Sequence, residues 1–326
     1  MSKRAAKHCG LVPLPVGKGH FFDFDLSSVK APFPAPEYVP KASAYQFDKT
    51  LLEDLQVGIR LGLNILLTGP TGCGKTSLPT QLAARAGYPT LRFNMDGETR
   101  VTHLRGQQKP VAVNGVLSLE FEYGLLALAM KQGWWVVLDE IDAASPAVLF
   151  VLQSVLEEGN RSIQIPETGE RIEAHPSFRL FATANTVGYR ATSRAKHAGT
   201  NVLNTAFVDR FGMVLGVDYP ERETEFAMLS VHLPEFAATE DGEVLLAAVT
   251  HVAEVLRKAT TFRSDFSTRR AIQWGRLMSQ YPRQDGPFPF DVLRSAELSF
   301  IRKIESPNDA KVARETIQRV FGYEDQ

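Results

Sequence analysis

The stretch Gly69-Pro70-Thr71-Gly72-Cys73-Gly74-Lys75-Thr76 matches the phosphate-binding pattern G-x-x-x-x-G-K-[ST]. It follows an apolar segment that predicts a strand and precedes a segment with helical periodicity, which is the setting this motif requires. The glycines let backbone N–H groups close around a β-phosphate at the start of a helix. We expect Lys75 to reach the β- and γ-phosphates and Thr76 to offer its hydroxyl to Mg²⁺. The motif predicts ATP and Mg²⁺ as cofactors; the strand–loop–helix setting disfavours the alternative, a glycine turn without a ligand.

Working outward, short apolar segments alternate with helical patterns up to residue 219, and only helical patterns follow Pro220. Runs such as 134–138, apolar throughout, are typical of strands buried on both faces of a parallel sheet. We expect a proline-rich extended arm over 1–40, a doubly wound α/β domain over 41–219 and an all-helical lid domain over 220–326. The candidate strands are 64–68, 90–95, 134–139, 178–184 and 213–218, and the candidate lid helices are 221–231, 243–258, 268–280, 290–304 and 309–321.

Two acids, Asp139 and Glu140, follow directly after the apolar strand 134–138. Ligands of open α/β sheets lie at the carboxyl ends of the strands, so these side chains are expected to face the phosphates. We expect Asp139 to hold Mg²⁺ and Glu140 to orient the attacking water. The alternative for such an acid is a cap on the next helix, which we favour for Asp142.

Three further polar residues are candidates for the same site. Asn185 follows the strand 178–184, where its amide would reach the γ-phosphate or the attacking water; a lone Asn in this place is otherwise a turn residue. Arg210 is either a surface partner of Asp209 or an arginine finger supplied to a neighbouring subunit. Arg269 opens a lid helix and is either a solvated residue or a sensor of nucleotide state. Spacing alone does not decide between the two roles for either arginine.

The span from about 38 to 275 resembles the MoxR-type branch of AAA+ ATPases, and within it the CobS-type small subunit of aerobic cobaltochelatase. The resemblance is carried by segments 69–76, 135–142, 175–188, 209–210 and 267–274. It implies an AAA+ core, Asn185 as sensor 1, Arg210 as the arginine finger and Arg269 as sensor 2. It also implies a homo-oligomeric ring, expected to be a hexamer, and a von Willebrand A-type or chelatase-like protein partner. The segment 189–192 departs from the family pattern, which puts the identity of the client in doubt.

Two β-hairpin insertions are predicted within the α/β domain. The segment 104–124 alternates around Asn114-Gly115, a strong hairpin turn signal, and segments 161–165 and 171–173 flank a second turn at 167–170. By the resemblance, such hairpins line or cap the ring and contact the substrate or partner. The alternative is that both are surface ribbons without a role.

Composition narrows the class of function. Lys and Arg total 36 against 37 Asp and Glu, so the net charge of −1 gives no footprint for nucleic acid or an anionic membrane. The spacing of the two cysteines, Cys9 and Cys73, predicts neither a disulfide framework nor a metal site, and no apolar run is long enough to span a bilayer. We therefore expect a cytoplasmic ATPase that remodels or energises a partner, with cobaltochelatase-like metal insertion as the nearest named case. The alternatives are a MoxR-type activator of another metalloenzyme, a nucleotide-gated scaffold, and a nucleic-acid-linked motor.

Overall fold

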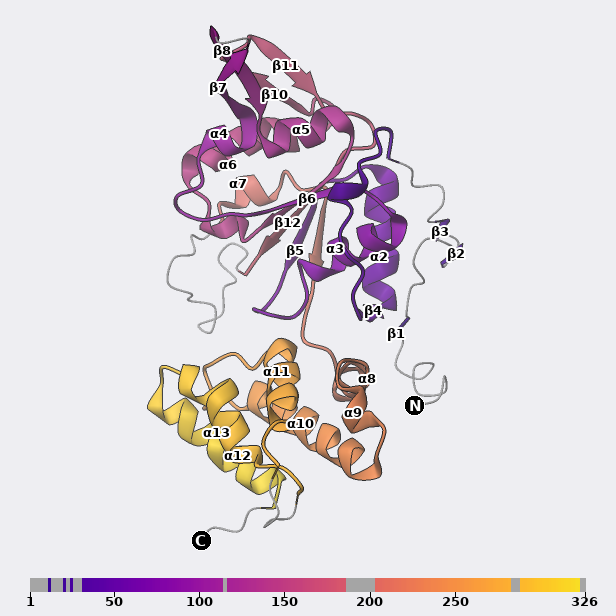
Figure 1. The fold of residues 1–326 in the computed structure, drawn as a ribbon, viewed down its shortest axis with the longest axis vertical. Helices are drawn as coiled ribbons and strands as arrows, with labels where there is room; N and C mark the ends of the chain where they lie inside the picture. The colour runs from indigo at the N-terminus through magenta and orange to yellow at the C-terminus, as the bar shows by residue number, and fades with distance from the viewer. Residues whose placement is uncertain are drawn as a thin grey trace.

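The computed structural model describes residues 31–113, 116–185, 203–282 and 288–322, together with three two-residue strands nearer the N-terminus. A five-stranded parallel sheet lies at the centre of the first part of the chain, in the order β13-β5-β12-β9-β6 (Figure 1). All five residues of β9 are buried, as the run of apolar residues predicts. The strands are β5 (Ile65–Thr68), β6 (Thr90–Asn94), β9 (Trp135–Asp139), β12 (Arg179–Ala184) and β13 (Met213–Gly216). Each lies inside a predicted segment, so the doubly wound α/β fold is confirmed.

Side chains that alternate along the strands enter two separate cores, one on each face of the sheet. Ile65 and Val137 pack with helices α2 (Lys49–Leu61) and α3 (Ser77–Ala86). Leu66 and Val136 face the opposite core. That second face is covered by α4 (Val101–Arg105), α5 (Leu125–Gln132), α6 (Pro146–Leu156) and α7 (Thr205–Val208). The loops at the carboxyl ends of the strands are thereby held from both sides.

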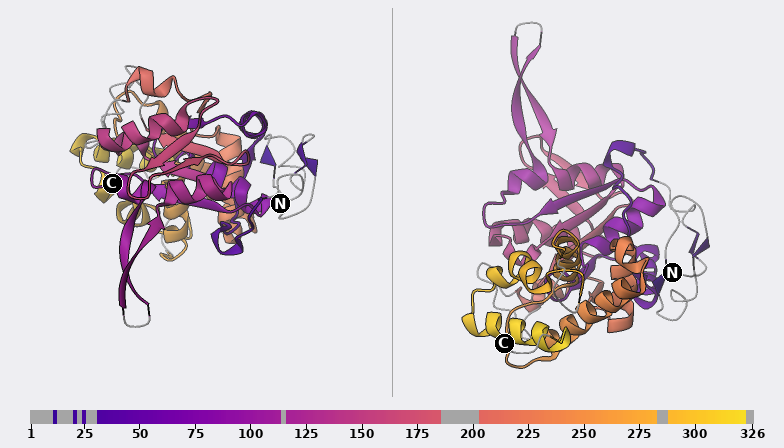
Figure 2. Two further views of the ribbon diagram at one scale, coloured as in Figure 1. Left: turned by 90° about the horizontal axis from the view of Figure 1, so that it is seen from above. Right: turned by 60° about the horizontal axis from the view of Figure 1, so that its bottom comes forward.

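Both predicted hairpins are present. Strands β7 (Gly106–Val113) and β8 (Val116–Tyr123) form a long ribbon that projects from the body (Figure 2), with its turn at 114–115 outside the described residues. Pro110 pairs with Leu119 in this two-stranded ribbon, where each strand has an open edge and a proline is better tolerated than in a central strand. The second hairpin joins β10 (Ser162–Ile165) to β11 (Glu170–Glu173).

The second hairpin is not the surface ribbon that one alternative predicted. Ile163, Ile165 and Ile172 are buried in the core that α5 and α6 cover. These isoleucines lie on one face of the two strands, as the period of two residues requires. One face of both strands is therefore part of the folded body, and the four-residue turn, 166–169, is exposed.

Parts of the N-terminal arm lie against the α/β core. The two-residue strand β1 (Leu11–Val12) pairs with β4 (Phe47–Asp48), and β2 (His20–Phe21) pairs with β3 (Phe24–Asp25). The indole N–H of Trp134 donates to the carbonyl of Phe33 at 2.7 Å, and the Tyr38 ring packs on the same indole, 5.0 Å between centroids. Other residues before 31 lie outside the described part, and the boundary of the arm stays a prediction.

Within the described residues after β13, the regular elements are helices, which pack around a core of their own. They are α8 (Arg222–His232), α9 (Pro234–Ala237), α10 (Glu240–Lys258), α11 (Thr268–Met278), α12 (Val292–Ser299) and α13 (Pro307–Val320). The predicted helix 290–304 was wrong in its length: it ends at Ser299, and a short 3₁₀ turn, Ile301–Lys303, follows. Phe300 interrupts it with φ −145°, because its buried ring packs on those of Phe266 and Trp274. In the described ranges no helix is both long and apolar enough to cross a membrane.

Candidate nucleotide-binding site

A polar cleft of about 340 Å³ lies at the carboxyl ends of the strands, beside the loop that joins β5 to α3. Most predicted site residues line it: Thr71, Gly72, Gly74, Lys75, Thr76, Asp139, Glu140, Asn185 and Arg269. Gly69, Pro70 and Cys73 belong to the loop without lining the cleft. Burial raises the pKa of the Cys73 thiol. The strand–loop–helix context of the motif therefore produces the expected concave site.

Two loop glycines are required by their surroundings. Gly69 has φ 149°, and a Cβ there would lie 1.8 Å from the carbonyl oxygen of Val217. Gly72 has φ 75°, and a Cβ there would lie 2.7 Å from the Cβ of Ser267, in the helical part of the chain. The loop thus packs directly against the helices that follow the sheet.

Lys75 is buried at the bottom of the loop. Its ammonium donates to the carbonyls of Gly69 and Pro70, both at 2.8 Å, and to Oδ1 of Asn185 at 2.9 Å. Burial lowers the pKa of Lys75, while nearby acids, Asp142 and Asp139 among them, oppose the shift. The ammonium therefore lies between the phosphate loop and the end of β12.

Asp139 is the centre of a hydrogen-bond network. Its Oδ1 accepts from the hydroxyls of Thr76 and Thr183, both at 2.6 Å. Its Oδ2 accepts from Arg92 at 2.5 Å. Burial favours the protonated carboxyl, but the hydrogen bonds from Thr183, Thr76 and Arg92 outweigh it and lower the pKa of Asp139. The carboxylate is thus held ionised and fixed in orientation.

Glu140 has a backbone conformation that residues other than glycine rarely adopt. With φ 56° and ψ 47° it is left-handed. Its N–H donates to the hydroxyl of Thr183 at 3.0 Å, so Thr183 holds both acids of the pair. Strained backbone of this kind is often found at functional sites. It turns the chain at the end of β9, and Glu140 lines the cleft.

Asp142 corrects one prediction. It does not cap a helix: α6 follows Ser145 as its N-cap residue, and Asp142 is fully buried. Its Oδ2 accepts from the backbone N–H of Asn185 at 2.9 Å. Asp142 therefore fixes the end of β12, where the Asn185 amide bonds to Lys75.

The two arginines are placed differently. Arg269, near the start of α11, lines the cleft from the helical side. Arg210 follows α7, is exposed and does not line the cleft. The surface pairing with Asp209 is absent too, since Arg210 makes no ion pair with any described residue.

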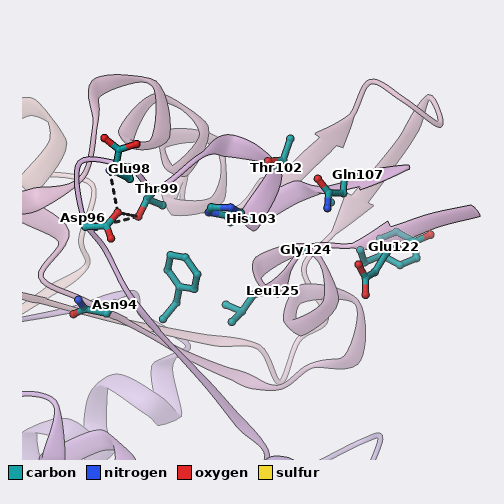
Figure 3. A pocket seen from close by; sticks show the side chains of 13 residues that line it. Asn94, Asp96, Glu98, Thr99, Thr102, His103, Gln107, Glu122, Gly124 and Leu125 are labelled. Atoms are coloured by element: carbon teal, nitrogen blue, oxygen red, sulfur yellow. Dashed lines mark hydrogen bonds between the residues drawn. The ribbon is translucent and has the colours of Figure 1, made fainter. Parts of the chain in front are cut away.

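A second cavity, of about 450 Å³, opens beyond the carboxyl end of β6 at the root of the β7–β8 ribbon (Figure 3). His103 of α4 packs on the Phe93 ring, with 6.1 Å between centroids, and Glu122 of β8 lines the ribbon side. Asn94 lines this cavity as well as the cleft beside the loop. The two hollows are therefore neighbours around the end of one strand.

Comparison with known proteins agrees with this geometry. Residues 64–211 match the family described as the AAA domain of the dynein-related subfamily. Over 292 residues the chain is 32% identical to the aerobic cobaltochelatase subunit CobS of Sinorhizobium sp, covering 88% of this chain and 84% of that relative. The chain belongs to the CobS-like AAA+ ATPases.

Two further similarities concern larger or more distant proteins. Over 161 residues the CobS-like ATPase is 40% identical to midasin of Dictyostelium discoideum, which is 49% of this chain and 2% of midasin. The solved Thermotoga maritima RuvB Holliday junction branch migration motor is 16% identical, covers 80% of this chain and 70% of its own, and has a TM-score of 0.48.

The oxygen donors of this AAA+ ATPase suit Mg²⁺. The hydroxyl of Thr76 and the carboxylate of Asp139 meet at the cleft, 2.6 Å apart. Within the described ranges, no group of three or more His, Cys, Asp or Glu side chains is arranged to hold a metal. That pattern fits a cation that is usually held by one or two protein oxygens together with phosphate oxygens and water.

Two cleft residues of the ATPase, Arg92 and Thr183, were missed by the sequence prediction. Each belongs to a strand that pairs with β9, next to Asp139. Their proximity depends on the strand order, which places β6 and β12 on either side of β9. In the sequence, each of them appears only as a polar residue near the end of an otherwise apolar strand. That pattern does not show that the residue contacts Asp139.

Proposed function

We propose that this ATPase hydrolyses Mg-ATP in a homo-oligomeric ring, expected to be a hexamer, and uses the energy to remodel or energise a partner protein. The observation that carries the proposal is the convergence of loop, strand-end and helical-domain side chains on one cleft. They are Lys75, Thr76, Asp139, Glu140, Asn185 and Arg269. A pure nucleotide binder needs no acid beside the loop and no polar residue at the end of β12, so a nucleotide-gated scaffold is disfavoured.

Each residue has a role in the proposed reaction. Lys75 neutralises phosphate charge on binding, and Thr76 with Asp139 would hold Mg²⁺, which would neutralise further phosphate charge. Glu140 orients the water that attacks the γ-phosphorus, and the Asn185 amide contacts the γ-phosphate or that water. Catalysis then depends on positioned charge rather than on a covalent intermediate.

The arginines link the reaction to the assembly. Arg269 approaches the cleft from the helical side, which supports the role of reporting nucleotide state to the lid. Arg210 is exposed and away from its own cleft, which supports a role as an arginine finger for the neighbouring subunit.

The partner is proposed from the CobS relative. A chelatase-like or von Willebrand A-type protein is the first candidate, and a different metalloenzyme served by a MoxR-type activator is the second. The β7–β8 ribbon and the cavity at its root are candidate contact surfaces. Leu117 and Leu119 on the ribbon are 75% and 64% exposed, so they are available to contact a partner.

Two substitutions test the ATPase mechanism. Lys75→Ala should weaken ATP binding about 100-fold, because several charge-assisted hydrogen bonds are lost. Glu140→Gln should keep binding but lower kcat about 10²- to 10⁴-fold, because a general base is removed. Nucleotide titration and steady-state hydrolysis measure both effects, and Lys258→Ala, an exposed lysine on α10, controls for loss of charge. Undiminished hydrolysis in both cleft variants would contradict the assignment.

A further inference from the structure

A path of polar contacts runs from the phosphate loop to the start of α11. Tyr219 lies in the connection after β13, and its hydroxyl donates to the carbonyl of Thr71 at 2.8 Å. Burial raises the pKa of Tyr219, so this hydroxyl remains a donor at neutral pH. The Arg257 guanidinium lies over its ring, 4.3 Å from the centroid. The tyrosine is thus held by the loop at one end and by α10 at its face.

The path continues through a buried ion pair. Arg257 donates to both carboxylate oxygens of Glu225, at 2.8 and 2.6 Å, and the two side chains are 13% and 1% exposed. Arg257 also donates to the carbonyl of Phe266, and the hydroxyl of Thr268 donates to Glu225 at 2.7 Å. A buried pair with this many partners tolerates little displacement, because a lost contact leaves a buried charge unsatisfied. Helices α8 and α10 and the start of α11 are therefore held as one body.

This body carries Arg269 into the cleft. Arg269 follows Thr268 directly, and Ser267, the N-cap of α11, packs against Gly72 of the loop. The van der Waals contact at Gly72 sets how near the loop and helix come. The hydrogen bond from Tyr219 is directional, so it also fixes the orientation of the body relative to the loop.

We propose that Tyr219 is a positioning residue for ATP hydrolysis, which orients Arg269 by tying the phosphate loop to the α8–α10–α11 body. The inference rests on the proposed role of Arg269 at the cleft. Phosphates bind the backbone N–H groups of such a loop. A hydrogen bond to the Thr71 carbonyl therefore fixes the position of the α8–α10–α11 body relative to the phosphate-binding part of the chain.

The test is Tyr219→Phe, which keeps the ring over Arg257 and removes the hydroxyl. We expect kcat to fall about fivefold, the value of one ordinary hydrogen bond, with KM for ATP within about twofold. Because Tyr219 acts through Arg269, the double variant Tyr219→Phe/Arg269→Ala should be no slower than Arg269→Ala alone. Tyr88→Phe is the control: its hydroxyl donates to the carbonyls of Gly133 at 2.9 Å and Ser177 at 3.3 Å. None of the three residues lines the cleft, and the kcat of this variant should be unchanged.

The inference would be overturned by unchanged kcat in Tyr219→Phe, by effects that multiply in the double variant, or by full activity of Arg269→Ala. None of these would affect the ATPase assignment, which Lys75→Ala tests separately. An equal loss in Tyr88→Phe and Tyr219→Phe would also overturn it, because a general loss of stability would then explain both.

Discussion

At the scale of single residues, the backbone conformation of Glu140 lowers the stability of the fold while it places a carboxylate in the cleft. Among the residues that the structure describes, it is the one other than glycine with a positive φ. Left-handed backbone costs a side-chain-bearing residue of this kind about 1–3 kcal/mol. The surrounding contacts, such as the bond from its N–H to Thr183, keep it there. The protein therefore gives up stability to place a carboxylate in the cleft.

We predict that Glu140→Gly abolishes turnover and raises the free energy of unfolding by about 1 kcal/mol. The relieved strain exceeds the roughly 0.4–1 kcal/mol that glycine costs by adding freedom to the unfolded chain. Urea unfolding and ATP hydrolysis measure the two effects.

Gly87→Ala provides the matched control for strain. Gly87 caps α3 with φ 64°, and no atom lies within 4 Å of an added Cβ, so this change introduces strain without a clash. It should lower the free energy of unfolding by about 1 kcal/mol. A Glu140→Gly protein less stable than the wild type would refute the strain argument.

The site residues that sequence predicted best are those that lie together in the chain. The loop 69–76 and the pair Asp139 and Glu140 are local motifs, so their residues can be recognised without knowing the fold. Arg92 and Thr183 reach Asp139 from other strands, so their roles depend on a strand order that no local pattern encodes. Asp142 was misassigned because a buried acid and a helix cap look alike in sequence.

At the scale of elements, the two hairpins differ in how much they contribute to the core, and so in whether they can be shortened. The β10–β11 hairpin places three isoleucines in the core, so shortening it from Ile165 to Arg171 would remove core packing along with any contact surface. The β7–β8 ribbon exposes its leucines instead. The root of the β7–β8 ribbon meets the turn end of the β10–β11 hairpin, where Tyr123 donates to Glu170 at 2.5 Å and Lys131 bonds to both. This exposed cluster adds little stability but links the two insertions.

We predict that shortening the β7–β8 ribbon leaves basal ATP hydrolysis within a few-fold and abolishes stimulation by the partner. Residues 110–119 are replaced by Asn-Gly, which joins the paired residues Lys109 and Glu120 by a favoured two-residue turn. The measurement is the ATPase rate with and without the candidate partner protein, together with a pull-down in ATP and in ADP.

A second variant identifies what the ribbon contributes. Leu117→Ser/Leu119→Ser keeps the ribbon and removes its apolar surface. It should lose stimulation to the same extent if the leucines make the contact. Normal stimulation of the shortened protein would exclude the ribbon and direct attention to the N-terminal arm or the helical domain.

The strands of the sheet were predicted more accurately than the helices that follow it. Apolar runs located the five strands to within two residues, because strands buried on both faces leave a continuous signal. The break at Phe300 was missed because it depends on packing against two rings that are distant in sequence. The helix α9 is one turn long and gives too short a period to detect.

At the scale of the whole molecule, a single chain leaves Arg210 outside its own cleft. We predict that Arg210→Ala and Lys75→Ala, each inactive alone, recover part of the hydrolysis rate when mixed. A mixed ring contains some interfaces that pair an intact loop with an intact finger. The rate is measured across mixing ratios, and the control is a mixture of Lys75→Ala with Glu140→Gln, whose defects both lie in the cleft of one chain. A fully active Arg210→Ala monomer would contradict the prediction.

The three hydrogen bonds of Lys75 have a consequence for nucleotide exchange. An ammonium has three protons to donate, and here the oxygens of Gly69, Pro70 and Asn185 accept all three. A phosphate oxygen can bond to Lys75 only by displacing one of them, so ATP enters by substitution, and the same oxygens compete for the ammonium whenever ADP is bound. These three oxygens therefore oppose the binding of any phosphate oxygen to Lys75, so the affinity of the site for ATP and for ADP alike includes the free-energy cost of displacing one of them.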